Sequence, residues 1–236
     1  MKFALSLVAA LAVAGSASAA SLVNGGFEQP GAGSSMYLTA GSTYLPGWTV
    51  VDSVPGGDNE IQYTSNSAYA AYGVVASEGA NFLELTGVVG RGKGVKSDAI
   101  DTTAGSTYRV AFDVGAFFVR GQGSYGDVTM DLLVNDVLAG SFTNTLSLST
   151  PGSDWQRFSY DFVATGPSVR LTFLASTALT SSYLGAGLDN VTFALQAPGT
   201  TPTQGGVPEP GVWALMIVGF GLAGSRLRRQ SRPVLA

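Results

Sequence analysis

The chain has 236 residues, of which 45% are hydrophobic and only 12% are charged, so it can bury a sizeable core. It contains no cysteine and no histidine, which excludes disulfides, Cys/His zinc sites, thiolate nucleophiles and Ser–His hydrolase machinery. The formal net charge is −4, and Lys2 and the last four arginines place much of the basic charge at the two ends. The acidic body between them argues against nucleic acid as a partner.

Residues 1–20 have the pattern of a secretory signal peptide. Lys2 is followed by an apolar run from Phe3 to Gly15 and then by Ala17-Ser18-Ala19, small residues of the kind found at a cleavage site. A buried N-terminal helix is the alternative, but the run has no polar face that would make it amphipathic. We therefore expect an exported protein whose mature chain begins near residue 20 or 21.

A hydrophobic period of two predicts antiparallel strands along residues 21–196. Between positions 108 and 114, for example, Tyr, Val, Phe and Val alternate with Arg, Ala and Asp. Such alternation is typical of strands with one buried face and one solvated face, so Asp113, Asp131 and Asp161 are expected to be solvated. Asn135-Asp136 predicts a hairpin turn. Strands are expected over 48–51, 82–85, 108–114, 128–134, 158–163, 169–173 and 191–195.

These short strands and their Gly-rich turns predict an all-β fold, an antiparallel two-sheet sandwich. Residues 197–206, which are small, polar or proline, predict a flexible linker. Gly211 to Ser225 then carries no charge and is followed by Arg226, Arg228, Arg229 and Arg232. Because a bilayer-spanning helix needs about 20 apolar residues, this single hydrophobic helix suits a transient stop in the inner membrane. The arginines would hold the C-terminus in the cytoplasm.

Residues 207–236 resemble a PEP-CTERM sorting tail. The tripeptide Pro208-Glu209-Pro210 is followed by Trp213-Ala214, the apolar segment and the arginines, in the order of the proteobacterial form of this signal. The resemblance implies an exosortase-type processing enzyme as partner, and a place in the envelope or extracellular matrix of a Gram-negative bacterium that produces exopolysaccharide. A plain C-terminal membrane anchor is the alternative.

The edges of the sandwich resemble galactose-binding-like jelly rolls, which include carbohydrate-binding modules and NGxFE domains. The similarity rests on Leu22-Val23-Asn24-Gly25-Gly26-Phe27-Glu28, Leu45-Pro46-Gly47-Trp48 and Leu188-Asp189-Asn190-Val191. In that fold a structural Ca²⁺ commonly joins the first and last strands, which implies Glu28 and Asp189 as its carboxylate ligands. The alternative is that Glu28 caps a loop and Asp189 makes a turn hydrogen bond.

The acidic side chains give no spacing that marks a catalytic pair, so the sequence predicts that the protein is not an enzyme. Tyrosines in loops are suited to sugar recognition, which needs aromatic faces and a few polar groups. We therefore predict glycan contacts at Tyr69, Tyr72, Tyr125 and Arg120, with core or rim packing as the alternative.

The predicted function is an exported, non-catalytic matrix protein associated with extracellular polysaccharide. A purely structural protein without a glycan site is the second interpretation, and a polysaccharide-active enzyme is the third.

Overall fold

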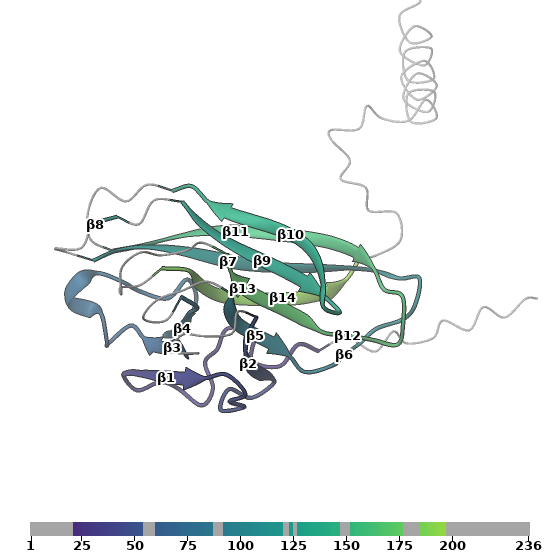
Figure 1. The fold of residues 1–236 in the computed structure, drawn as a ribbon, viewed down its shortest axis with the longest axis horizontal. Coiled ribbons are helices and arrows are strands. Elements are labelled where there is room, and N and C mark those ends of the chain that lie inside the picture. The colour runs from purple at the N-terminus through teal and green to yellow at the C-terminus, as the bar shows by residue number, and fades with distance from the viewer. Residues whose placement is uncertain are drawn as a thin grey trace, which may run out of the picture. The chain divides into compact units, whose positions relative to one another are not determined.

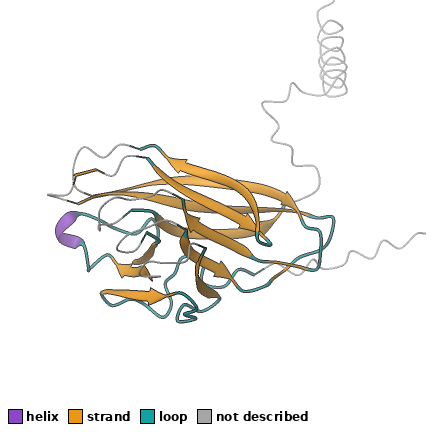
Figure 2. Cartoon of the chain, viewed as in Figure 1, coloured by secondary structure: helices purple, strands orange, loops and turns teal. Residues whose placement is uncertain are grey.

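The computed structural model describes residues 21–53, 60–86, 92–119, 123–124, 127–146, 152–176 and 185–196. They form two large antiparallel sheets, a two-stranded sheet and one short 3-10 turn, η1 (Ala70–Tyr72) (Figures 1 and 2). The predicted all-β, two-sheet sandwich is therefore confirmed. The predicted signal peptide, linker and sorting tail lie outside the described residues. Within the described part of the chain, no helix is long and apolar enough to cross a membrane.

The first sheet has seven strands, in the order β1-β3-β4-β14-β7-β11, with β8 paired to β7 (Figure 1). The last strand of the domain, β14, thus lies inside this sheet, between β4 and β7. Their bounds are Ser35–Thr39 (β1), Glu60–Ser65 (β3), Asn81–Glu84 (β4), Thr107–Val119 (β7), Gly123–Ser124 (β8), Gly152–Val163 (β11) and Gly187–Leu195 (β14).

The second sheet has five strands, in the order β10-β9-β13-β5-β2, and β12 pairs with β6 in the small third sheet. Their bounds are Trp48–Asp52 (β2), Lys93–Ser97 (β5), Ile100–Asp101 (β6), Val128–Val134 (β9), Val137–Asn144 (β10), Ser168–Val169 (β12) and Leu171–Ala175 (β13). The turn between β9 and β10 is the predicted one, and Asn135 and Asp136 adopt the positive φ angles of 50° and 65° that a tight hairpin requires.

The main core fills the space between the two large sheets. Strand β7 shows how the sequence builds it, because every second residue from Tyr108 to Ala116 is buried in this core. Phe112 contacts Phe173 of the opposite sheet edge-to-face, with 4.9 Å between ring centroids. Trp48 belongs to this core and is 2% exposed.

A smaller cluster lies on the other face of the seven-stranded sheet, which we call the outer face. It consists of Val74, Phe82 and Phe117, with Trp155 packed against them. Val74 belongs to residues 66–80, which connect β3 to β4 and which we call the covering loop. The covering loop therefore shields part of the outer face from solvent.

Candidate active site

A row of six residues crosses the outer face, with one residue from each of six strands. Residues directly opposite one another in neighbouring strands point to the same face, so the register places these positions side by side. From β1 to β11 the row is Tyr37, Gln62, Glu84, Gly187, Gly115 and Trp155. Its middle thus carries a carboxylate and two positions without side chains, and its β11 end carries an indole ring.

The two glycines are required because Trp155 lies against both. A side chain at Gly115 would begin 2.7 Å from Cζ3 of Trp155, and one at Gly187 would begin 2.5 Å from Cζ of Phe117. Carbon atoms do not approach so closely without displacing their neighbours. Trp155 also packs edge-to-face on Phe82 and on Phe117, with 5.6 Å between ring centroids in each pair. The row therefore ends in a rigid aromatic group.

Glu84 is the acidic group of the row, and it is only 2% exposed. Its Oε1 accepts hydrogen bonds from the backbone N–H of Thr86 at 2.8 Å and of Gly185 at 3.0 Å, and the Thr86 hydroxyl donates to the same oxygen. Hydrogen bonds of this kind favour the charged carboxylate, whereas burial disfavours it. The three hydrogen bonds to Oε1 hold the carboxyl group of Glu84 in a fixed orientation, which a proton-transfer group needs.

Tyrosines border the acidic end of the row. The hydroxyl of Tyr69 donates to Oε1 of Gln62 at 3.1 Å, and the rings of Tyr69 and Tyr72 lie 6.4 Å apart. Burial raises the pKa of Tyr37, and Tyr69 and the nearby carboxylates, including Glu84, raise it further. The Tyr37 phenol therefore stays protonated at neutral pH and is available as a hydrogen-bond donor.

Two buried aspartates beside the row fasten the covering loop to the sheet. Asp189 and Asp113 are directly opposite each other on β14 and β7, and are 0% and 5% exposed. Asp189 Oδ2 accepts the backbone N–H of Ser77 at 2.8 Å and of Glu78 at 3.0 Å. Asp113 accepts the Ser77 hydroxyl and, at 3.0 Å, the guanidinium of Arg157. Asp113 is on the outer face as predicted, but the prediction that it is solvated is wrong, because the covering loop buries it.

The electrostatic state of Asp189 follows from this burial. Burial raises the pKa of Asp189 to about 7, although the backbone N–H groups that donate to it lower the pKa. The neighbouring charge of Asp113 raises the pKa further.

Glu28 and Asp189, the predicted calcium ligands, bind the two ends of the same segment, residues 77–81. Oε1 of Glu28 accepts the backbone N–H groups of Ala80 and Asn81, both at 2.9 Å, and Oε2 accepts the side-chain amide of Asn81 at 2.8 Å. Among the described residues, no three His, Cys, Asp or Glu side chains are grouped so that they could hold a metal ion. Glu28 and Asp189 thus make loop hydrogen bonds of the kind that the alternative to a calcium site expects. Calcium stays a prediction.

The predicted glycan residues are only partly described. Tyr69 and Tyr72 are brought together at the end of the row, and Tyr72 is 39% exposed. Arg120 and Tyr125 lie outside the residues whose side chains are described, as do Pro208, Glu209, Pro210, Trp213 and Ala214 of the sorting motif.

The sequence alone did not single out Glu84 or Trp155. Glu84 is one of several scattered acidic residues, and nothing in the sequence around Trp155 indicates that it packs on the outer face. They form one site only through the register of β4, β14, β7 and β11. The one local signal is the pair of glycines, Gly115 and Gly187, each placed inside a strand, where glycine often marks a close approach of another group.

The fold and this row define a β-sandwich with a buried carboxylate and aromatic side chains on one sheet face. A family model described as HpiC1-like, HpiC1 cyclase, matches residues 18–193. The chain therefore belongs to the HpiC1-like family. No curated protein matches the chain.

Solved structures of cyclases share the fold. The Stig cyclase Fisc from Fischerella sp. TAU, in complex with (3Z)-3-(1-methyl-2-pyrrolidinylidene)-3H-indole, is 19% identical, with a TM-score of 0.53 over 76% of this chain and 98% of that chain. A cyclase from Fischerella sp. TAU in complex with 4-(1H-indol-3-yl)butan-2-one is 22% identical, with a TM-score of 0.52 over 76% of this chain and 98% of that chain. More distant neighbours include a CBM4 structure, 15% identical over 75% of this chain and 100% of that chain, with a TM-score of 0.39.

The prediction that the protein is not an enzyme is therefore wrong. The family match and the structural neighbours are cyclases and point to an enzyme. The physical reason is that the residues of the row come from separate strands and meet only through the strand register, so the spacing of acidic residues along the chain does not reveal the site.

Proposed function

We propose that the protein is a cyclase that closes a ring in a small unsaturated substrate bound on the outer face. The HpiC1-like family match carries this proposal. The fold is shared with cyclases whose bound ligands are indoles substituted at carbon 3. A 3-substituted indole with an unsaturated side chain is therefore the substrate class that we propose.

Ring closure of such a molecule passes through a carbocation. Protonation of the side chain creates the cation, π electrons form the new carbon–carbon bond, and loss of a proton restores a neutral product of unchanged mass. Aromatic faces stabilise cations, and Trp155 supplies such a ring at the end of the row. We assign to Glu84 the acceptance of the departing proton, because its carboxylate is fixed by the N–H groups of Thr86 and Gly185.

An isomerisation assay tests this function. The full chain is incubated with an indole that carries an unsaturated side chain at carbon 3, and chromatography with mass detection follows a new species of identical mass. General acid–base groups contribute about 10²–10⁴-fold, so Glu84→Gln should slow the reaction by at least about 100-fold. Glu60→Gln is the matched control on the same sheet, and it should retain most of the activity. Equal rates for Glu84→Gln and the unsubstituted protein would show that Glu84 takes no part in the reaction.

Association with polysaccharide is a second proposal, and it is supported by the Tyr69–Tyr72 pair. The two rings lie 6.4 Å apart and Tyr72 is 39% exposed, so one aromatic face is available for the C–H surface of a sugar. A glycan array on the full chain, compared with Tyr72→Ala, tests this. Absence of binding to acidic and neutral polysaccharides would leave the tyrosine pair as part of the cyclase site.

We further propose that the protein is exported and that it binds a structural Ca²⁺. Glu28 and Asp189, with main-chain carbonyl oxygens, would hold the ion, and its role would be to pin residues 77–81 to the sheet. Both carboxylates already contact this segment.

A further inference from the structure

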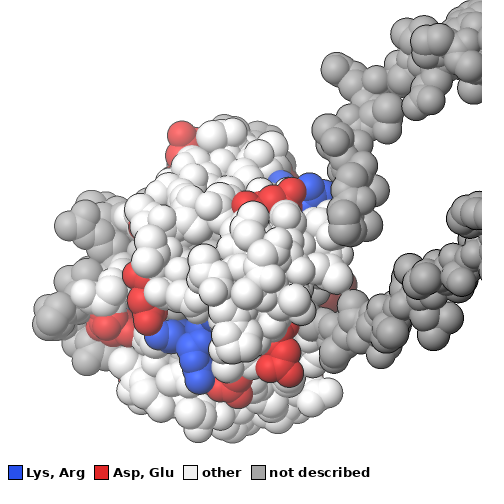
Figure 3. Space-filling model, turned by 90° about the vertical axis from the view of Figure 1, so that its right-hand side faces the viewer, with Lys and Arg blue, Asp and Glu red and all other residues white. Residues whose placement is uncertain are grey.

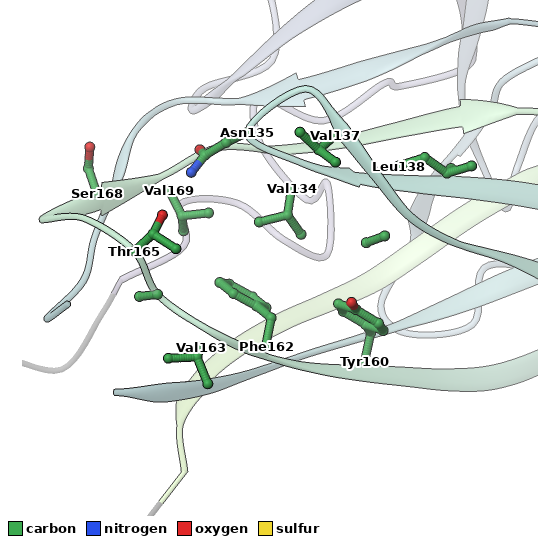
Figure 4. A pocket seen from close by; sticks show the side chains of 12 residues that line it. Val134, Asn135, Val137, Leu138, Tyr160, Phe162, Val163, Thr165, Ser168 and Val169 are labelled. Carbon is green, nitrogen blue, oxygen red and sulfur yellow. The ribbon is translucent and has the colours of Figure 1, made fainter. Parts of the chain in front are cut away.

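A pocket of about 280 Å³ lies at the other side of the seven-stranded sheet from the candidate active site. It opens between the β9–β10 hairpin and the C-terminal end of β11 (Figure 4). Tyr160 and Phe162 line it from β11 and pack against the main core. Trp155, an odd-numbered residue of the same strand, faces the outer side. The pocket and the row are therefore separate sites.

The lining of the pocket is uncharged and has two ends of different character. Its body is apolar, and the rings of Tyr160 and Phe162 are stacked there with 6.5 Å between centroids and 17° between planes. Asn135, Thr165 and Ser168 gather at one end (Figure 4). None of the residues that line the pocket is acidic or basic. Figure 3 shows that uncharged residues also cover most of the visible end of the molecule.

The pocket leaves apolar surface in contact with water. Val137, Leu138 and Val163 line it and are 70%, 59% and 57% exposed. The register of β10 shifts between Leu138 and Gly140, at the edge of the five-stranded sheet. Burial of apolar surface is favourable. Binding of a molecule that fills this space is therefore favoured, and it requires no rearrangement of the main core.

We propose that this pocket binds a neutral molecule of one or two rings that carries a hydroxyl or carbonyl group. A cavity of about 150 Å³ accommodates benzene, so the volume of about 280 Å³ suits a somewhat larger molecule. A charged ligand is disfavoured, because the apolar body offers no opposite charge in exchange for lost hydration. The hydroxyls of Thr165 and Ser168 and the amide N–H groups of Asn135 provide hydrogen-bonding groups for the single polar substituent, whereas Oδ1 of Asn135 accepts the backbone N–H of Arg170 at 2.9 Å.

Methyl-resolved NMR of the full chain with 2-naphthol as the probe tests this site. We expect saturable shifts of the methyl groups of Val134, Leu138 and Val169, with a Kd below about 1 mM. Naphthalene-2-sulfonate, which has the same rings and a negative charge, should leave these methyl groups unchanged. Leu138→Asp places a charge at the exposed mouth of the pocket and should weaken binding of 2-naphthol at least about tenfold.

Two further variants make the outcome decisive. Val75→Asp is the matched control, because Val75 is 45% exposed and does not line the pocket, and it should bind 2-naphthol like the unsubstituted protein. Ala139→Leu fills part of the pocket and should also weaken binding, which covers the case in which Leu138→Asp fails to fold. The proposal is overturned if 2-naphthol produces no shifts, if the sulfonate binds equally well, or if both pocket variants bind normally.

Discussion

Four different strands supply the residues of the site, which are Glu84, Gly187, Gly115 and Trp155. The carboxylate and the glycines have different physical roles. Glu84 supplies a buried carboxylate held by backbone N–H groups. The glycines allow the indole of Trp155 to lie close to the backbone. The site therefore needs glycine at positions 115 and 187 as much as it needs the side chains of Glu84 and Trp155.

Gly187→Ala should therefore destabilise the protein and disturb the site. The added Cβ would lie 2.5 Å from Phe117 and 2.8 Å from Trp155, so at least one ring must move. Overpacking of this kind costs about 1–3 kcal/mol. Urea denaturation measures the loss, with Gly166→Ala as the matched control because no atom lies within 4 Å of its added Cβ. A Gly187→Ala variant as stable as the control would show that Trp155 is not packed tightly on the glycine.

At the scale of elements, the alternation of hydrophobic residues was sufficient to predict β7, β9, β11 and the β9–β10 turn. Strand β10 was missed because Val137 and Leu138 are followed by Ala139, Gly140 and Ser141, which are small and give no apolar period. The burial of Asp113 was missed for a different reason. The covering loop that buries it comes from a distant part of the chain, and Asp189 and Asp113 bind Ser77 of that loop.

The attachment of the covering loop should depend on pH in calcium-free buffer. The pKa of Asp189 is about 7 in the folded protein and about 3.9 in an unfolded chain. At Asp189 the folded state thus binds more protons between these values, so the contribution of this residue to stability is greatest below about pH 4 and falls as the pH rises towards about 7. The loss is on the order of 4 kcal/mol. Thermal unfolding from pH 4 to 8 with a chelator present measures it, and Asp189→Asn should flatten the profile. A profile that rises over this range in the unsubstituted protein would contradict the assignment.

Calcium should reverse this trend if Glu28 and Asp189 share an ion. A metal that binds only the folded state stabilises it by about 2.7 kcal/mol at a hundredfold excess over Kd. At pH 7.5, a chelator should lower the melting temperature by several degrees, and Asp189→Asn should abolish that sensitivity. Identical melting with calcium and with chelator would exclude the structural ion.

At the scale of the whole molecule, the sequence predicts processing at both ends. The short apolar run before Ala17-Ser18-Ala19 and the tail that begins at Pro208-Glu209-Pro210 flank the sandwich. Intact mass measurement of the protein from its native host should therefore give a chain that begins near residue 20 or 21 and lacks the segment with Trp213. A mature extracellular form that retains Trp213 would indicate a simple anchor instead of a sorting signal.

We propose that the outer-face row binds the substrate of a cyclase. A crystal structure of the full chain soaked with 4-(1H-indol-3-yl)butan-2-one, the ligand of a cyclase with the same fold, tests it most directly. We predict density for the indole on the outer face, near the carboxylate of Glu84 and against the ring of Trp155, and loss of that density in Trp155→Ala. Density found only in the pocket lined by Tyr160 and Phe162, or no bound ligand at all, would contradict the claim.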